Sequence, residues 1–203
     1  MKILVTGFEP FGRWQRNPSG ETALHLNGTV VGGAKISGLR LPVSFRRAAA
    51  PLIAAIDEVH PDVVLNLGLG APGGIRVERV AVNRCTAPPG GDNDGYDPDG
   101  EPVLSDGPAT YRSTLPVASI VYRLSTLGFG AAPSDSAGEF LCNYSMYMAL
   151  HHISTHRLPI RAGFIHGSPL PEAPSEQGEG WGMQLMEWVA FTEAVIGVLD
   201  DRH

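Results

Sequence analysis

The chain has 203 residues, of which 43% are hydrophobic and 18% charged, so it can bury a sizeable core and does not have a disordered composition. Its formal net charge is −6 and its basic residues form no run, which argues against a nucleic-acid surface because phosphates require clustered positive charge. No apolar stretch approaches the roughly 18 residues that a membrane span requires, so no membrane partner is expected.

The N-terminal segment and the cysteines indicate the compartment. Residues 1–12 contain one Lys and an apolar run that Gly7 interrupts, which is too short for the apolar core of a signal peptide. Cys85 and Cys142 could pair, but free thiols are expected in a chain of this size without an export signal. We therefore expect a soluble protein in the reducing environment of the cytoplasm.

The first elements expected along the chain are a strand, a loop and a helix. Residues 1–6 predict a buried strand, and the Gly- and Pro-containing loop after it includes Phe8 and Phe11. The pattern of residues 21–26 predicts a helix, with Ser19 as its expected N-cap.

The next segments predict an extended stretch, a helix and a central strand. Residues 30–41 form the extended stretch, and apolar side chains recur at helical spacing over residues 45–59. His60 and Pro61 end that helix. Residues 62–67 are a continuous, β-branched apolar run, typical of a parallel strand buried on both faces.

The rest of the chain contains a long segment without apolar periodicity. Residues 75–82 alternate and predict a strand, whereas residues 84–108 are rich in Gly, Pro and Asp and predict a long functional or mobile loop. The remaining expected elements are helices over residues 113–126, 140–152 and 180–199 and a short strand over residues 161–166.

Strands that alternate with helices predict an α/β fold. We expect a three-layer α/β/α sandwich with an open, twisted, largely parallel sheet and helices on both faces. Residues 1–203 show no internal repeat and no linker, so they are expected to form a single domain.

Cys142 is a candidate nucleophile. The helix that contains it is expected to begin near Phe140, which places the thiol in the first turn, beside the positive end of the helix dipole. That position favours the thiolate, which is the nucleophilic form. Cysteine is also a common buried apolar residue, so position alone leaves both roles open.

A cysteine nucleophile needs a base, and His166 is the histidine best placed to be one. It ends a short apolar strand, and the carboxyl ends of strands in an open parallel sheet line the ligand crevice. A histidine at a strand end is more often structural than catalytic. Glu78 could orient the imidazole, but a single acid in a strand is usually solvated or paired with an arginine, and nothing in its own segment distinguishes it.

Two further patterns suggest other chemistry. Residues 68–73 match G-x-G-x-x-G after a strand, but a strand rather than a helix follows, which argues against dinucleotide binding. His152 and His156 are spaced as zinc ligands on one helix face could be, but no third ligand lies nearby in the sequence and Pro159 indicates that the helix ends. We therefore expect neither a metal nor a cofactor.

Short motifs along nearly the whole chain share one family resemblance. They are Val5-Thr6-Gly7-Phe8-Glu9-Pro10-Phe11-Gly12 with Asn17-Pro18, Glu78-Arg79-Val80-Ala81 with Asn83, Asp106-Gly107-Pro108-Ala109, Thr114-Leu115-Pro116, Ser136-Ala137-Gly138 with Phe140-Leu141-Cys142-Asn143, and Gly163-Phe164-Ile165-His166. In type and order these motifs resemble the pyroglutamyl peptidase I, or pyrrolidone-carboxylate peptidase, family. Several of them are specific to that family rather than general to α/β proteins.

The resemblance implies a cysteine peptidase of the omega type. Cys142 would attack the amide that follows an N-terminal pyroglutamyl residue and form a thioester, which water then hydrolyses. His166 would take the thiol proton and return it to the departing amine, and Glu78 would orient the imidazole. Backbone N–H groups at the start of the helix near Cys142 would hold the oxyanion.

The resemblance also implies how the substrate is held. Phe8 and Phe11 match the aromatic pair that the family places against the lactam ring, and Phe140 and Leu141 match the segment on its other side. Asn17 matches the residue that supports the loop. The partners implied are peptides with N-terminal pyroglutamate and further copies of the chain, because the family often forms dimers or tetramers.

The sequence departs from the family pattern at two places. Members commonly contain an Asp-Asp-Ala-Arg-Ile-Pro run shortly after the Glu, where this chain has residues 85–89, so the usual Arg is missing. Arg84 is the nearest possible substitute, and Leu69 stands where a Gln is common. These departures leave a nonenzymatic α/β binding protein as the alternative, with nucleotide binding through the Gly-rich loop ranked below both.

Overall fold

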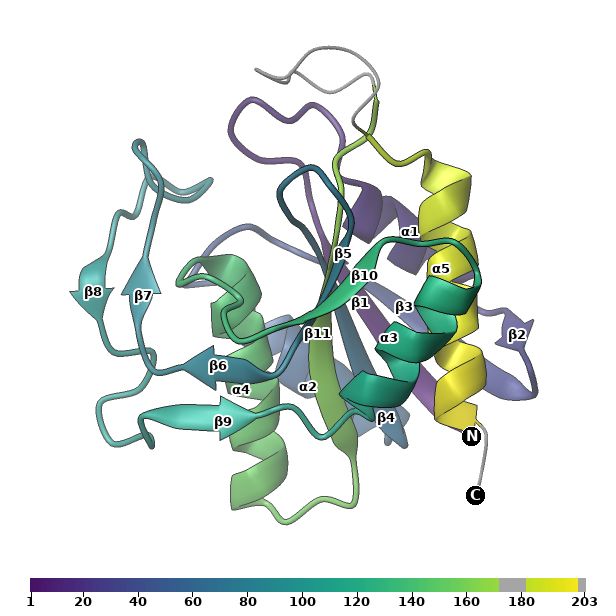
Figure 1. Ribbon diagram of the computed structural model, residues 1–203. Helices are drawn as coiled ribbons and strands as arrows, with labels where there is room; N and C mark the ends of the chain where they lie inside the picture. The colour runs from purple at the N-terminus through teal and green to yellow at the C-terminus, as the bar shows by residue number, and fades with distance from the viewer. Residues whose placement is uncertain (172–181, 201–203) are drawn as a thin grey trace.

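A seven-stranded sheet in the order β10-β5-β11-β4-β1-β3-β2 forms the centre of the computed structural model, which describes residues 1–171 and 182–200 (Figure 1). Its strands are β1 (Lys2–Phe8), β2 (Val30–Val31), β3 (Ala34–Leu41), β4 (Val63–Leu69), β5 (Ile75–Glu78), β10 (Ala131–Ser134) and β11 (Arg161–Gly167). The strands β1, β3, β4 and β11 are mutually parallel, whereas β5 is antiparallel to β11 and parallel to β10. The predicted α/β fold with a largely parallel sheet is confirmed, with β5 and β10 running the opposite way at one side and β2 antiparallel to β3 at the other.

Helices cover both faces of the sheet, so the three predicted layers are present. One face is covered by α1 (Pro18–Leu26), α3 (Val117–Thr126) and α5 (Leu185–Asp200), and the other by α2 (Ala49–Val59) and α4 (Leu141–Thr155). Figure 1 shows α3 and α5 on one side of the strands and α4 on the other. No helix in the described part of the chain is both long and apolar enough to cross a membrane.

Alternation along each strand decides which layer a side chain enters. In β11, Ile165 packs under α5, whereas Ala162 and Phe164 pack on the α4 side. His166 follows at the same period of two and therefore shares the α4 face with Phe164. In β5, Val77 belongs to the α5 side, which leaves Glu78 on the α4 face as well.

Two small sheets lie beside α4, and they differ from the sequence-based expectation. The strand predicted over residues 75–82 divides at Arg79, where β6 (Val80–Val82) leaves the main sheet to pair with β9 (Thr110–Arg112). The loop predicted over residues 84–108 contains the paired strands β7 (Cys85–Thr86) and β8 (Asp99–Glu101). Strands this short contain no periodic signal, which is why the sequence did not indicate them.

The helix boundaries also differ from the expected ones. The N-cap of α1 is Asn17 rather than Ser19, because the Asn17 side chain accepts the Ser19 N–H at 3.2 Å and Pro18 fits the first turn. The helices α2 and α3 begin four residues later than predicted, at Ala49 and Val117. The last helix begins at Leu185, and residues 180–181 of the predicted range lie outside the described residues.

Trp188 of α5 is fully buried beneath the end of β11. Its Nε1–H donates to the Ser168 carbonyl at 2.9 Å, and a Cβ on Gly167 would lie 2.6 Å from its ring. We expect Trp188→Ala to lower the free energy of unfolding by about 3–5 kcal/mol, measured by urea denaturation. Trp188→Phe, which keeps most of the packing, should cost much less. Equal losses in the two variants would contradict this account.

Candidate active site

Cys142 lies in the first turn of α4, over the end of β4. It is a free, partly exposed thiol. A Cβ added to Gly68 would lie 2.8 Å from the Cys142 sulfur and 2.5 Å from the Phe164 ring. A side chain at position 68 would therefore displace the sulfur, the ring or both. Gly68 of the Gly-rich segment 68–73 thus has a structural reason that does not involve phosphate, because it leaves room for Cys142.

His166 and Glu78 form a hydrogen-bonded pair on the same face. Nδ1 of His166 lies 2.8 Å from Oε1 of Glu78, and because a carboxylate only accepts, the imidazole is the donor. In the pairing of β5 with β11, Glu78 lies opposite Phe164, which is two residues before His166 and on the same face of the sheet. The Phe164 ring packs 4.7 Å from the imidazole, and a Cβ on Gly70 would lie 2.9 Å from the His166 Cβ. Sheet register and packing fix the ring.

The charge of this pair is set by its neighbours. Burial alone would lower the pKa of His166, but the charge and hydrogen bond of Cys142 and those of Glu78 raise it from 6.5 to about 9. Glu78 is only 1% exposed, and within the described residues its second oxygen, Oε2, has no hydrogen-bond partner. A buried carboxylate of this kind is strongly destabilised unless a cation faces it, so it favours the protonated imidazole. Cys142, His166 and Glu78 together form an acid–base unit.

Aromatic rings surround the start of α4. The Phe140 ring lies 6.0 Å from that of Phe11 and 5.6 Å from that of Phe45, which in turn lies 5.3 Å from Tyr144. Sequence reasoning had identified Phe11 and Phe140 but missed Phe45, because it stands alone in a segment without a motif. The structure therefore places an apolar, aromatic wall on one side of Cys142.

Phe8 and Leu141 occupy different positions from Phe11 and Phe140. Phe8 is the last residue of β1, not part of the loop, and it is 3% exposed within the α4-side core. Leu141 is also buried in that core. Both lie behind the aromatic wall rather than at its surface.

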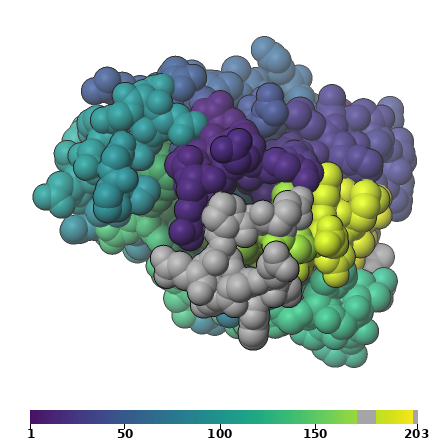
Figure 2. Space-filling model, turned by 90° about the horizontal axis from the view of Figure 1, so that it is seen from above, coloured from purple at the N-terminus to yellow at the C-terminus, as the bar shows by residue number. Residues whose placement is uncertain are grey.

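Asn17 holds the loop between β1 and α1. Its Nδ2 donates to the Glu9 carbonyl at 3.0 Å, and its Oδ1 accepts from the Ser19 hydroxyl at 2.7 Å. Glu9 in turn accepts from the backbone N–H of Val43 at 3.0 Å. Figure 2 shows these first residues, in purple, between the teal segment on one side and the yellow helix α5 on the other. Asn17 thus fixes the loop that presents Phe11.

Arg84 and Cys85 occupy the region where the family motif is missing. Nε of Arg84 pairs with Glu139 at 2.9 Å, so its guanidinium faces the surface side of the turn before α4. Burial and the charges of Glu101 and Glu139 raise the pKa of Cys85 to about 12, so its thiol stays protonated. In this region Arg84 is thus paired with a carboxylate, and Cys85 is a neutral thiol.

The two histidines spaced as zinc ligands have other partners. Nε2 of His152 lies 2.8 Å from Oδ1 of Asp57, and the His152 and His156 rings lie in contact, with centroids 4.3 Å apart and planes tilted by 41°. Among residues 1–171 and 182–200, no group of three or more His, Cys, Asp or Glu side chains is arranged to hold a metal ion.

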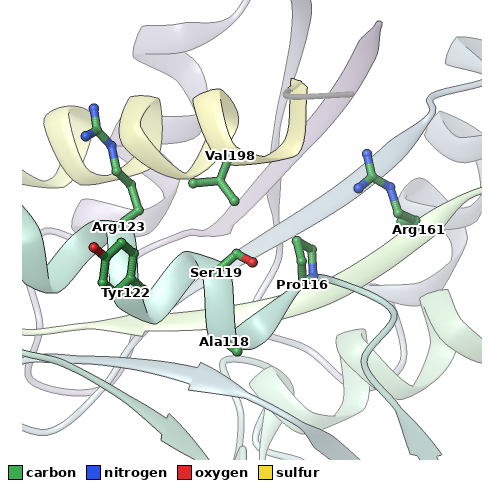
Figure 3. Close-up of a pocket in the computed structure, with 7 residues that line it drawn as sticks. All are labelled: Pro116, Ala118, Ser119, Tyr122, Arg123, Arg161 and Val198. Carbon is green, nitrogen blue, oxygen red and sulfur yellow. The ribbon is translucent and has the colours of Figure 1, made fainter. Parts of the chain in front are cut away.

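A cavity of about 700 Å³ lies elsewhere, along α3 (Figure 3). It is lined by Pro116, Ala118, Ser119, Tyr122, Arg123, Arg161 and Val198. Because α3 and α5 cover the opposite face from α4, this cavity is separated from Cys142 by the sheet. It takes no part in the site described above.

Comparison with known proteins gives a consistent result. The model of the pyroglutamyl peptidase family matches residues 1–198. The pyrrolidone-carboxylate peptidase of Pyrococcus furiosus is 44% identical over 85% of this chain and 83% of its own length. Pyrrolidone-carboxylate peptidase 2 of Photorhabdus laumondii is 44% identical over 96% of this chain and 89% of its own.

Solved structures agree with the sequence relatives. A mutant pyrrolidone carboxyl peptidase from P. furiosus superimposes with a TM-score of 0.93 at 36% identity, covering 100% of both chains. The pyrrolidone carboxyl peptidase of Thermococcus litoralis gives 0.92 at 38% identity, covering 97% of this chain and 92% of the other. With a thiol, an imidazole and a buried carboxylate meeting on one face of the same fold, the chain belongs to the pyroglutamyl peptidase family.

Proposed function

We propose that this protein is a cysteine peptidase that hydrolyses the amide bond after an N-terminal pyroglutamyl residue. The observation that supports it best is the assembly of Cys142, His166 and Glu78, whose mutual charges raise the pKa of His166 to about 9. Perturbed titration of groups that meet in one site is typical of catalytic acid–base pairs. Family membership supplies the substrate class.

In the proposed mechanism, the Cys142 sulfur forms a bond to the carbonyl carbon of the pyroglutamyl group. The carbonyl oxygen takes up the negative charge beside the first turn of α4, where Phe140 provides no side-chain cap and leaves backbone N–H groups available. His166, protonated at neutral pH, donates its proton to the leaving amine as the C–N bond breaks. The result is a thioester at Cys142 and a free peptide.

Water completes the reaction. His166, now neutral, takes a proton from a water molecule that attacks the thioester carbonyl, and pyroglutamate leaves as the Cys142 sulfur is expelled. The imidazolium is restored in this step. Glu78 keeps its hydrogen bond to Nδ1 throughout, so Nε2 remains the nitrogen that exchanges the proton.

The substrate-binding roles follow from the positions of the aromatic residues. Phe11 and Phe140, whose tilted rings pack against each other with centroids 6.0 Å apart, would contact the lactam ring together at the start of α4. Phe8 and Leu141 would support that wall from the core, and Asn17 would hold the loop of Phe11. A small neutral lactam suits such a wall because it requires no countercharge.

The proposed specificity predicts a clear selection among chromogenic substrates. We expect rapid hydrolysis of pyroglutamyl-naphthylamide and at least about 100-fold lower kcat/KM for glutamyl-naphthylamide, since its open, charged side chain and ammonium group lose solvation against an aromatic wall. Prolyl-naphthylamide, which keeps the ring but lacks the lactam carbonyl, is the matched control and should also be poor. Absence of turnover with all three substrates would indicate a binding protein instead.

We further propose that the enzyme acts in the cytoplasm as a homo-oligomer. The two cysteines are free, which suits a reducing compartment. The oligomer is what the family resemblance implies, and Val30, Tyr122 and Met186 are large apolar side chains that are more than half exposed. Light scattering that gives only the 21.6 kDa monomer across working concentrations would reject the oligomer.

A further inference from the structure

Asn143, the residue after the proposed nucleophile, is fully buried, and its side-chain amide holds a neighbouring backbone segment. Its Oδ1 accepts from the Val82 N–H at 2.8 Å, while its Nδ2 donates to the Val82 carbonyl at 2.9 Å and to the Arg84 carbonyl at 3.0 Å. Both ends of the amide are therefore satisfied by backbone groups of one segment.

That segment continues directly from the strand that contains Glu78. After Glu78 the chain turns at Arg79 and runs through β6, which has left the seven-stranded sheet. Val82 ends β6. The Asn143 amide thus connects the first turn of α4, which contains Cys142, to the segment that follows Glu78.

The first turn of α4 depends on such lateral contacts. Its N-cap, Phe140, makes no side-chain capping hydrogen bond, so the helix closes this turn through its backbone, as in the bond from the Tyr144 N–H to the Phe140 carbonyl at 3.0 Å. A second link on the same side is the backbone hydrogen bond from the Thr86 N–H to the Glu139 carbonyl at 2.8 Å. Asn143 is the side chain that fastens the turn at the position next to Cys142.

We propose that Asn143 is a positioning residue, which sets the place of the Cys142 sulfur relative to His166 and Glu78. The inference rests on the proposed function, because it assigns Asn143 a part in the same reaction. Loss of its three hydrogen bonds frees the turn to shift, and a displacement of about 1 Å between reacting groups can cost on the order of 100-fold in rate. Asn143 itself does not touch the reacting atoms.

The chain offers a matched control in Asn83. Its Nδ2 donates to the carbonyls of Leu104 at 2.8 Å and Gly107 at 3.2 Å, and its Oδ1 accepts from the Leu104 N–H at 2.9 Å. It therefore makes the same three kinds of bond, from the next residue of the same segment, but to a loop and not to α4. Asn143→Ala and Asn83→Ala remove equivalent hydrogen bonds and differ in whether the helix is released.

Two measurements distinguish positioning from mere stability. The first is kcat and KM with pyroglutamyl-naphthylamide: we expect Asn143→Ala to lower kcat about 100-fold with KM within about threefold, and Asn83→Ala to keep kcat within about threefold. The second is the rate of Cys142 alkylation by iodoacetamide against pH, in a Cys85→Ala background. Asn143→Ala should shift this profile because the contact with His166 is loosened, and Asn83→Ala should not.

The conservative variant gives a further test. Asn143→Asp keeps the acceptor for the Val82 N–H, and protonation of its second oxygen, which faces the carbonyls of Val82 and Arg84, would restore one donor, so it should recover part of the kcat lost in Asn143→Ala, with about a tenfold deficit remaining. If Asn143→Ala does not fold, as judged by circular dichroism, Asn143→Asp takes its place in both measurements. Wild-type kcat and a wild-type alkylation profile in the folded variant would overturn the proposal.

The alkylation profile also separates this proposal from the proposed function. It reports the coupling of Cys142 with His166 and needs no substrate. If the wild type failed to hydrolyse pyroglutamyl-naphthylamide, the proposed function would fail, while a shifted profile in Asn143→Ala alone would still support the positioning role. An unshifted profile with active wild type would reject the positioning role and leave the function standing.

Discussion

Cys142→Ala is expected to lose about 10⁴-fold or more of kcat/KM for pyroglutamyl-naphthylamide, because no other group in the site can form the thioester. The variant should fold normally, since the sulfur is partly exposed and alanine suits a first helical turn. Steady-state kinetics measure the loss, and circular dichroism checks the fold. Substrate binding should persist, because the aromatic wall is unchanged.

The control for this experiment is the other cysteine. Cys85 is buried and its thiol stays protonated, so Cys85→Ala should keep kcat/KM within about threefold while costing about 1 kcal/mol of stability. Iodoacetamide should label Cys142 alone in the wild type, as mass spectrometry of the digested protein would show. Robust turnover in Cys142→Ala, or inactivation through Cys85, would reject Cys142 as the nucleophile.

Glu78→Gln is expected to lower kcat/KM about 10²- to 10⁴-fold, the range seen when the acid of a catalytic triad is made neutral. Glutamine keeps the size and can still accept the Nδ1 proton, so the change removes charge and little else. The imidazolium persists up to the His166 pKa of about 9, which is raised by Cys142 and, to a smaller extent, by the hydrogen bond and charge of Glu78. Without it the pKa falls, so the alkaline limb of the pH–rate profile should move to lower pH.

A second carboxylate–imidazole pair supplies the control for Glu78. Asp57 and His152 also lie 2.8 Å apart, but on α2 and α4 outside the site. Asp57→Asn should therefore leave both kcat/KM and the alkaline limb unchanged, whereas Glu78→Gln moves both. A wild-type pH profile in Glu78→Gln would show that the carboxylate does not act on His166.

Much of the fold follows from patterns that are local in the sequence. The strand at residues 62–67 was evident because a strand buried on both faces is apolar throughout, and the main helices were evident from their spacing. The direction of β5 was not predictable, because it depends on how the segment after Gly70 turns back along β11. Nor was β10, since Ala131–Ser134 at the sheet edge has no continuous apolar pattern.

The residues of the site also differ in whether the local sequence indicates them. Cys142 and His166 could be proposed from their local positions, at a helix start and a strand end. Glu78 could not, because what distinguishes it is burial against His166 across β5 and β11, and the two residues are 88 apart in the chain. The role of Gly68 was misleading for the same reason: its partner is a sulfur from α4, and the local pattern resembled a phosphate loop.

The position of β5 and β10 at one edge of the sheet has a consequence for inactivation by heat. Glu78 belongs to the outer pair of strands, whereas His166 lies in the parallel strands that form the centre of the sheet. Sheet margins open at lower free energy than central strands. Fraying of the β5–β10 margin would separate the carboxylate from the imidazole while the central strands stay folded, so catalysis would fail at a lower temperature than global melting.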